Sequence, residues 1–358
     1  MIMILLGLLG IAIIVAGIYL LINWLNKKSG IIKNQGGGTE LTKVIDQKIF
    51  FPALATGNQN VLFFSNQQES AFYKFSFSDK KTEKISENLD APDNIIWSPD
   101  RTKGILLVSY DKYIFEKYGS PFASPETADG TATKWLYDFS PKKLVKQLNS
   151  NIQKVFWSPD SQKIFYHYND ETIDTLNLAD PNGQNWQKLA DLSPGWYGFA
   201  GWIDEENLVY FRQPTDVSGA EIYTINITSK QVKKLTDGTK NASVAPSGKW
   251  IIYELFHRAQ ENYTLAMMKN DGSGVKDFGL VGGVDKIVWF PDSQSLIAAI
   301  RESGKTTDTF YKINSETGQK EEIKYKSESS IDAQNLMLSA DGKILYFTSD
   351  DYLYKLGL

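Results

Sequence analysis

The chain contains no cysteine and only two histidines among its 358 residues. Without cysteine there can be no disulfide, no thiolate metal site and no thiol nucleophile. The two histidines, His167 and His257, are too far apart in the sequence to form the closely spaced pair typical of zinc sites. We therefore expect no metal and no cofactor. The absence of cysteine is also compatible with an oxidising compartment.

An excess of basic charge is absent too. The chain has 38 Lys and Arg against 42 Asp and Glu, a net charge of −4, and the two signs are mixed along it. No basic face for a nucleic acid is predicted. The sequence also lacks a phosphate-binding Gly-x-x-x-x-Gly-Lys-Ser/Thr loop and a Gly-x-Ser-x-Gly nucleophile elbow. No catalytic residue is identified from motifs.

Charge is missing altogether from the first 25 residues, which form an apolar run. About 20 such residues cross the hydrocarbon core as a helix, so we expect a transmembrane helix at residues 1–26. A cleaved signal peptide is the alternative, but a charged start and a small-residue cleavage site are not evident. A pilin-type filament helix usually carries an early glutamate, and the first acidic residue here is Glu40. Residues 27–38, with three consecutive glycines, are expected to form a flexible linker.

A short motif recurs in the remaining residues, 39–358. It reads Trp-Ser-Pro-Asp at Trp97–Asp100 and Trp157–Asp160, and Trp-Phe-Pro-Asp at Trp289–Asp292, each time followed by an apolar run. Proline followed by aspartate favours a type I turn. The preceding tryptophan is expected to pack between neighbouring repeats. Strand, tight turn and strand at a near-fixed period indicate a repeat architecture.

Seven units can be read, most of them as four short strands. They span residues 49–86, 94–148, 154–189, 197–235, 241–278, 286–324 and 335–356. The last unit is one strand short, and Thr39–Val44 resembles the missing strand. We therefore predict an all-β fold, a seven-bladed β-propeller of four-stranded blades closed by an N-terminal strand, preceded by a single transmembrane α-helix. Closure would remove raw sheet edges.

The aromatic-Ser-Pro-Asp motif resembles the WD-like propeller repeat of the TolB family, which also occurs in propeller domains of prolyl oligopeptidase-type proteins. The resemblance covers about residues 39–358. It implies a non-catalytic ring that binds other proteins. The lysines after residue 26 would place the ring in the cytoplasm by the positive-inside rule, but large domains can translocate regardless and this repeat family is mostly exported. We expect a single-pass membrane protein with an extracytoplasmic propeller.

Two places break the repeat pattern. Residues 111–134 form an insertion in unit two, and Ser193–Tyr197 is an aromatic loop between units three and four. Loops on a rigid scaffold often carry binding, and aromatic side chains are enriched in interface cores. The candidate residues for contact with a protein partner are Tyr113, Phe115, Tyr118, Phe122, Trp196 and Tyr197. The alternative in both places is structural packing.

Two classes of function remain. The first is a membrane-anchored, non-catalytic interaction or scaffold module of the cell envelope. The alternative is a propeller enzyme, a lyase or hydrolase using the central funnel, and a subunit of a surface filament or layer is a further possibility. An enzyme would need converging polar groups where the first strands begin; the candidates are Asp93, Asn94, Gln153, Asp285 and Gln334.

Overall fold

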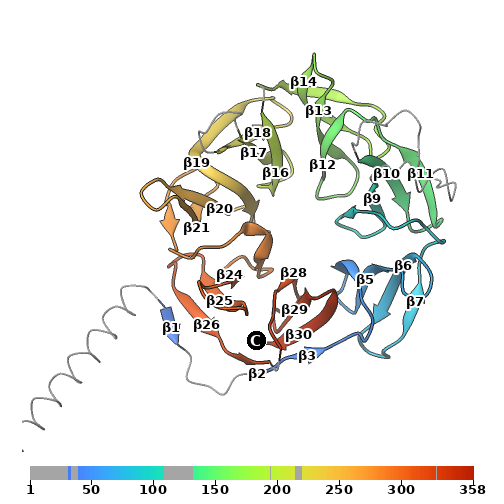
Figure 1. Ribbon diagram of the computed structural model, residues 1–358. Helices are drawn as coiled ribbons and strands as arrows, with labels where there is room; N and C mark the ends of the chain where they lie inside the picture. Colours follow the sequence, from blue (N-terminus) through green and yellow to red (C-terminus); the bar gives the residue numbers. More distant parts are fainter. Residues whose placement is uncertain (1–30, 34–38, 109–131, 194, 214–219, 328) are drawn as a thin grey trace, which may run out of the picture.

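The computed structural model describes residues 31–33, 39–108, 132–193, 195–213, 220–327 and 329–358. The predicted transmembrane helix at 1–26 lies outside these residues and stays a prediction. No helix within the described part of the chain is long and apolar enough to cross a membrane. Antiparallel sheets, most of them four-stranded, are arranged around a central opening and follow one another in chain order (Figure 1).

Units one to three each form one antiparallel sheet of four strands. Alternating apolar and polar residues in these segments favour strands that are buried on the faces toward the neighbouring sheets. The bounds are β4 (Phe50–Leu54), β5 (Asn60–Ser65), β6 (Ala71–Ser76) and β7 (Thr82–Lys84); β8 (Asn94–Trp97), β9 (Lys103–Val108), β10 (Thr133–Asp138) and β11 (Lys143–Gln147); β12 (Ile152–Trp157), β13 (Ile164–Asn169), β14 (Asp174–Ala179) and β15 (Gln187–Asp191).

Units four and five share one seven-stranded sheet. The sequence predicts separate strands at the end of unit four and the start of unit five, but β19 runs unbroken through both. Its register shifts between Lys240 and Ala242, so a bulge turns the strand where a loop was expected. The bounds are β16 (Trp196–Trp202), β17 (Asn207–Gln213), β18 (Ala220–Asn226), β19 (Val232–Val244), β20 (Trp250–His257), β21 (Asn262–Lys269) and β22 (Lys276–Asp277).

Units six and seven each include a segment from the start of the chain. Strand β1 pairs parallel with β26, inside the range predicted as linker, and β2 pairs with β27. The bounds are β1 (Ile31–Lys33), β2 (Thr39–Glu40) and β3 (Thr42–Lys43); the 3-10 turn η2 (Val284–Lys286); β23 (Ile287–Trp289), β24 (Ser295–Ile300), β25 (Thr309–Asn314), β26 (Lys320–Ile323) and β27 (Tyr325–Lys326); β28 (Gln334–Leu338), β29 (Ile344–Ser349) and β30 (Tyr352–Gly357).

The predicted pairing of the two chain ends is present. Strand β3 lies antiparallel to β30, with Thr42 opposite Lys355 and Lys43 opposite Tyr354. The Val44 amide donates to the Leu353 carbonyl at 2.8 Å. The N-terminal segment therefore supplies the fourth strand of unit seven, whose sheet has the order β28-β29-β30-β3.

The repeated turn behaves as the sequence predicts. The Thr102 amide donates to Asp100 Oδ1 at 3.0 Å, and the Lys103 amide donates to Ser98 Oγ at 3.0 Å. Arg101, the residue after Pro-Asp, has a φ of 62°, which is the left-handed position that follows a type I turn in a hairpin. Serine and aspartate oxygens thus hold the hairpin between the first two strands of the unit.

Trp97 and Trp157 of the motif, and Trp202 at the corresponding place in unit four, connect neighbouring units, whereas the indole nitrogen of Trp289 has no hydrogen-bond partner among the described residues. The indole nitrogen of Trp97 donates to the carbonyl of Phe51 in the preceding unit at 3.0 Å. Trp157 donates in the same way to Ile96, and Trp202 donates to the carbonyl of Trp157, both at 2.9 Å. Each bond joins the first strand of one unit to the first strand of the unit before it. The repeat therefore fixes how the sheets stand next to one another.

The core consists of apolar layers between adjacent sheets. Between units three and four, for example, Phe165, Leu176, Leu208 and Tyr210 pack together, and Phe165 and Leu208 are fully buried. Burying a side chain of this size contributes about 1.5–3 kcal/mol. These layers make the inter-unit interfaces stiff, so polar groups at their ends are held in fixed positions.

Candidate functional site

The loops between second and third strands and the links between units lie at one end of the ring, because antiparallel strands alternate in direction. We call this end the mouth. The opposite end carries the Ser-Pro-Asp turns. At the mouth between units three and four, titratable side chains from five strands meet, with an exposed tryptophan beside them.

His167 and Asp174 form a hydrogen-bonded pair at this place. The His167 Nε2 atom lies 2.7 Å from Asp174 Oδ1, because the β13–β14 hairpin sets Asn169 opposite Asp174. A carboxylate only accepts hydrogen bonds, so Nε2 carries a proton and Nδ1 is the unprotonated nitrogen of the neutral ring. Burial lowers the pKa of His167 below its usual 6.5, although Asp174 acts in the opposite direction. The ring is neutral at pH 7 and can accept a proton at Nδ1.

Tyr197 covers the pair from unit four. Its ring lies 4.9 Å from the His167 ring, and its hydroxyl donates to the Ser193 carbonyl at 2.6 Å. Burial raises the pKa of Tyr197 to about 12. The hydroxyl therefore stays protonated at neutral pH and holds the start of β16 against the link from unit three.

Trp196 precedes Tyr197 at the start of β16. It is 70% exposed, and the Lys154 ammonium lies 5.5 Å from its ring centroid. Gly195 lets the chain pass close to β17, since a Cβ there would come 2.9 Å from the Gln213 carbonyl oxygen. An exposed aromatic ring beside a cation is an arrangement that can hold an anionic ligand with a flat apolar face.

Lys134, in unit two, is a second lysine near the candidate site. It lies in β10, is only 8% exposed, and donates to the Ala132 carbonyl at 3.2 Å. Burial, together with the charge of Lys154, lowers the pKa of Lys134 to about 8. The charge of Lys154 also lowers the pKa of His167, so one exposed cation lies within electrostatic range of both groups.

A charged network lies next to this site on the unit-four side. Glu221 accepts hydrogen bonds from Arg212 at 3.0 Å, from Tyr223 at 2.8 Å and from Lys234 at 2.8 Å. Burial by itself would raise the pKa of Glu221, but these three donors outweigh burial and the pKa is lowered. The carboxylate is thus ionised and fully engaged, which makes this network a fixed wall of the site.

A cavity of about 500 Å³ lies beside Asp174. Asp174 lines it together with Ile173 and Asp191 of unit three and with Leu192 and Gly195 of the link to unit four. The carboxylate that orients His167 therefore faces an open space whose wall includes Gly195, the residue before Trp196.

Another buried carboxylate, between units six and seven, has a structural role. The Asp308 side chain is fully buried and lies 2.9 Å from both Lys286 Nζ and Arg301 Nε. It also accepts a hydrogen bond from the Ala333 amide at 2.8 Å. Every oxygen is engaged by a donor from a different segment, so this cluster joins two units and has no free group for chemistry.

The six residues predicted to contact a protein partner fall into two groups. Tyr113, Phe115, Tyr118 and Phe122 lie outside the described residues, so the predicted protein contact there stays a prediction. Trp196 and Tyr197 are both at the candidate site, but only Trp196 is exposed.

The five polar groups at the starts of first strands do not converge. Gln153 lies beside the candidate site, because its amide donates to the Asn169 carbonyl at 3.4 Å. The others belong to units two, six and seven; Asn94 accepts from the neighbouring Ile95 amide and Gln334 donates to Asp332. None of the five residues lines the cavity beside Asp174, or a second cavity between units two and three that is described below.

The groups missed from the sequence are Lys134, Lys154 and the His167–Asp174 pair. His167 and Asp174 flank a short polar turn, Asn169–Thr172, between two apolar runs. This hairpin pattern is the sequence signal from which the pair could have been predicted, because a hairpin brings residues on either side of its turn together. The described residues contain no group of three or more His, Cys, Asp or Glu that could hold a metal ion.

Neither a protein-family model nor a curated protein sequence matches the chain. Solved structures do. An oligogalacturonate lyase in complex with manganese matches with a TM-score of 0.64 at 12% identity, over 91% of this chain and 95% of that one. The oligogalacturonate lyase of Vibrio parahaemolyticus matches with a TM-score of 0.64 at 11% identity and the same coverage. TolB from Acinetobacter baumannii gives a TM-score of 0.47 at 15% identity, over 87% and 78% of the two chains.

At 11–12% identity these matches establish the fold, a β-propeller. They contradict the expectation that this chain is a non-catalytic interaction or scaffold module. That expectation depended on the TolB-like resemblance, whereas the two structures that match with a TM-score of 0.64 are enzymes, oligogalacturonate lyases. The alternative of a propeller enzyme fits the comparison better.

Proposed function

We propose that this protein is an enzyme that cleaves an acidic oligosaccharide by elimination, at the mouth of the propeller between units three and four. The observation that carries the proposal is the His167–Asp174 pair, a neutral base held 2.7 Å from its orienting carboxylate close to an exposed lysine and an exposed tryptophan. The fold shared with two oligogalacturonate lyases supports the same reaction class.

Trp196 and Lys154 bind the sugar in this proposal. The exposed indole face of Trp196 contacts the apolar face of a pyranose ring, and Lys154 pairs with the uronate carboxylate beside it. A cation at the carboxylate also acidifies the neighbouring C–H bond, because it stabilises the negative charge that develops when the proton leaves. A neutral oligosaccharide lacks the carboxylate and gains nothing from Lys154.

His167 acts as the general base. Its Nδ1 atom takes the proton from the carbon next to the carboxylate, and the electrons of that C–H bond form a C=C bond. The glycosidic C–O bond on the adjacent carbon breaks, and its oxygen leaves with the electron pair and takes a proton from water. Asp174 keeps the proton on Nε2 and stabilises the imidazolium that forms, which is the usual role of a carboxylate behind a catalytic histidine.

One lyase structure is a complex with manganese. The described residues here offer no matching set of His, Cys, Asp or Glu ligands. No step of the proposed chemistry is assigned to a metal.

We further propose that the seven units close into a seven-bladed ring through the β3–β30 pairing, and that residues 1–26 tether this ring to the outer side of a membrane. The uncharged run at Met1–Leu25 supports the tether. The paired chain ends support closure.

The test is turnover of trigalacturonate by the purified chain. Elimination creates a C=C bond conjugated to the carboxylate, which is followed by its ultraviolet absorbance, while hydrolysis creates a reducing end without that absorbance. We expect absorbance to rise with the wild type and to be lost in His167→Ala. The matched control is His257→Ala, because His257 also pairs with an aspartate, at 3.1 Å, but in unit five. Equal rates in both variants, or no turnover by the folded wild type, would overturn the proposal.

A further inference from the structure

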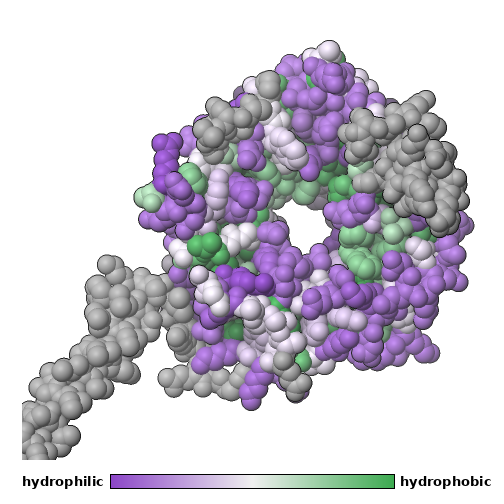
Figure 2. All heavy atoms as spheres, viewed as in Figure 1, coloured by the Kyte–Doolittle hydropathy of each residue, from purple (hydrophilic) through white to green (hydrophobic). Residues whose placement is uncertain are grey.

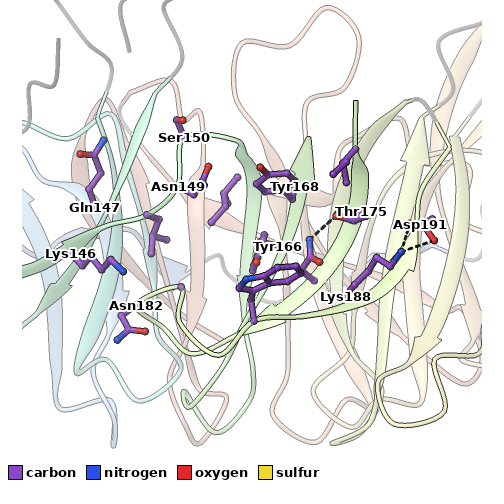
Figure 3. Close-up of a pocket in the computed structure, with 16 residues that line it drawn as sticks. Lys146, Gln147, Asn149, Ser150, Tyr166, Tyr168, Thr175, Asn182, Lys188 and Asp191 are labelled. Atoms are coloured by element: carbon purple, nitrogen blue, oxygen red, sulfur yellow. Dashed lines mark hydrogen bonds and ion pairs between the residues drawn. The ribbon is translucent and has the colours of Figure 1, made fainter. Parts of the chain in front are cut away.

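A second cavity lies between units two and three, and it shares Ile173 and Asp191 with the cavity beside Asp174. It has a volume of about 1140 Å³. One wall is the segment Lys146–Ser150, which ends β11 and leads to the next unit, and the other wall is made by β13, β14 and β15. Figure 3 shows Tyr166, Tyr168 and Thr175 between Asn149 on one side and Lys188 on the other. We call this cavity the rim groove.

Trp186 lines the rim groove and is 64% exposed. A tight turn holds it in place before β15. The Gly183 amide donates to the Asp180 carbonyl at 2.8 Å, and the Asn185 amide group donates to the Asp180 carboxylate at 2.6 Å. The indole is thus presented by a rigid turn, and large rigid aromatic groups contribute contact area at a low entropy cost.

Asn177 provides an independent sign of a ligand. It lies in β14, lines the groove and is 2% exposed. Its Nδ2 atom donates to Thr175 Oγ1 at 2.9 Å, but its Oδ1 atom has no partner among the described residues. A buried acceptor without a donor is costly and uncommon in folded proteins. A ligand hydroxyl would supply the donor.

The rest of the lining is mainly hydroxyl, amide and aromatic groups, with the charged Lys146, Lys188 and Asp191 and the aliphatic Leu148, Ile152 and Ile173 among them. The Tyr168 hydroxyl, for example, lies 3.2 Å from the Asn151 amide nitrogen and 3.3 Å from Asp170. The Lys188 ammonium is paired with Asp191 at 2.7 Å, so its charge is largely neutralised. Aromatic faces combined with neutral hydrogen-bonding groups match a polyhydroxylated ring better than they match an apolar helix or a strongly charged peptide.

We propose that the rim groove is a second carbohydrate site, which holds an oligosaccharide with one sugar ring against Trp186 and one hydroxyl donating to Asn177 Oδ1. The inference takes its sugar class from the proposed function but does not depend on the proposed catalytic residues. A chain bound in the groove would continue toward the cavity beside Asp174, because Ile173 and Asp191 line both cavities.

The test is calorimetric titration of the folded full chain with two probes, hexagalacturonate and cellohexaose. The groove is isolated in a Trp196→Ala background, which removes the sugar platform at the mouth. In that background we expect saturable binding of at least one probe. Trp186→Ala should weaken it about tenfold or more, because truncating an aromatic anchor removes a large part of a binding energy.

Asn177→Leu provides a second variant of similar size, which replaces the unpaired acceptor by an apolar group and should also weaken binding. Trp186 is exposed, so its variant keeps the test valid even if the Asn177 variant does not fold. Binding unaffected by Trp186→Ala, or no binding of either probe, would overturn the inference. If trigalacturonate is cleaved but groove binding is absent, only this inference fails. If groove binding is present without cleavage, only the proposed function fails.

Discussion

The ammonium nitrogen of Lys154 lies 5.5 Å from the centroid of the Trp196 ring, although the two residues come from different units. Lys154 belongs to β12 and Trp196 to β16, both on the inner side of the ring (Figure 1). Figure 2 shows that the central opening stays open when all side chains are drawn. The contact joins an aromatic face and a positive charge at one place on the mouth, and the proposed substrate has a matching apolar ring face and carboxylate.

The first prediction concerns these two residues. Lys154→Met should raise KM for trigalacturonate about tenfold or more, because a hydrogen bond to a charged group contributes about 1.5–3 kcal/mol. Binding of a neutral oligosaccharide at the mouth should be unchanged. Trp196→Ala should weaken both. Steady-state kinetics and calorimetric titration measure these effects.

Lys312→Met is the matched control for that experiment. Its ammonium also lies over an aromatic ring, 4.7 Å from the centroid of Phe290, but in unit six. If it raises KM as much as Lys154→Met does, the effect comes from net charge and the proposed contact with the carboxylate is wrong.

The second prediction concerns pH. The pKa of His167 lies below 6.5 because the ring is buried, so kcat/KM should fall on the acid side with a midpoint below that value. Asp174 raises the pKa of His167, and Asp174→Asn should therefore move the midpoint to still lower pH. It should also reduce kcat about 100-fold or more, since the ring loses its orienting group. The pH–rate profile of both proteins checks this.

The corresponding control is Asp277→Asn, which alters the other histidine–aspartate pair, His257–Asp277. It should leave the profile in place. A midpoint that moves upward in Asp174→Asn would contradict the assignment of His167 as the base.

The third prediction concerns the stability cost of Lys134. Its pKa falls from 10.5 in the unfolded chain to about 8 in the folded one, so the unfolded state binds more protons between these values. Stability should thus rise with pH across this window and be lowest below pH 8. Lys134→Met removes the penalty and should raise the free energy of unfolding at pH 7 by about 3 kcal/mol.

Urea denaturation at several pH values measures the difference between the two proteins. The advantage of the Met variant should shrink as the pH approaches 10.5. A constant difference at every pH would show that Lys134 is not charged and buried in the folded protein.

The fourth prediction tests the pairing of the chain ends. The Val44 amide bonds to the Leu353 carbonyl, so the adjacent pair, Lys43 and Tyr354, is a non-hydrogen-bonded pair with close Cα atoms. Cysteines at both positions should form a disulfide, because the geometry fits and the chain has no other cysteine. The crosslink should stabilise the protein by about 3–5 kcal/mol.

Thermal unfolding with and without reductant measures this stabilisation, and the two single-cysteine variants are the controls. Both should unfold like the wild type. If the double variant keeps two free thiols under oxidising conditions, β3 does not lie against β30.

Much of the fold could be predicted from the sequence because short local motifs mark each repeat. The Trp-Ser-Pro-Asp turns mark the hairpins, and in unit three β12 (Ile152–Trp157) and β13 (Ile164–Asn169) lie on either side of that turn. Strand β19 was predicted as two strands, since a polar stretch of Thr, Asp, Gly and Lys resembles a loop. Pairing with β18 and β20 on its two sides overrides that local preference.

The site was much harder to predict. Trp196 was found from its loop, but the lysine beside it is 42 positions away, and no local pattern brings the two together. The burial of Lys134 depends on packing against the next unit. His167 was judged only as a metal ligand, although the turn after it already places Asp174 nearby. The predicted function, a non-catalytic interaction or scaffold module, was wrong because the motif identifies only the fold. Many propellers with different activities share that fold.

The most direct measurement is the mass of the products formed from trigalacturonate. Elimination gives an unsaturated fragment that is lighter by one water molecule than the corresponding hydrolysis product. We predict the lighter fragment from the wild type and from His257→Ala, and none from His167→Ala. Fragments that all carry the added water, or unsaturated fragments that persist in His167→Ala, would contradict the account.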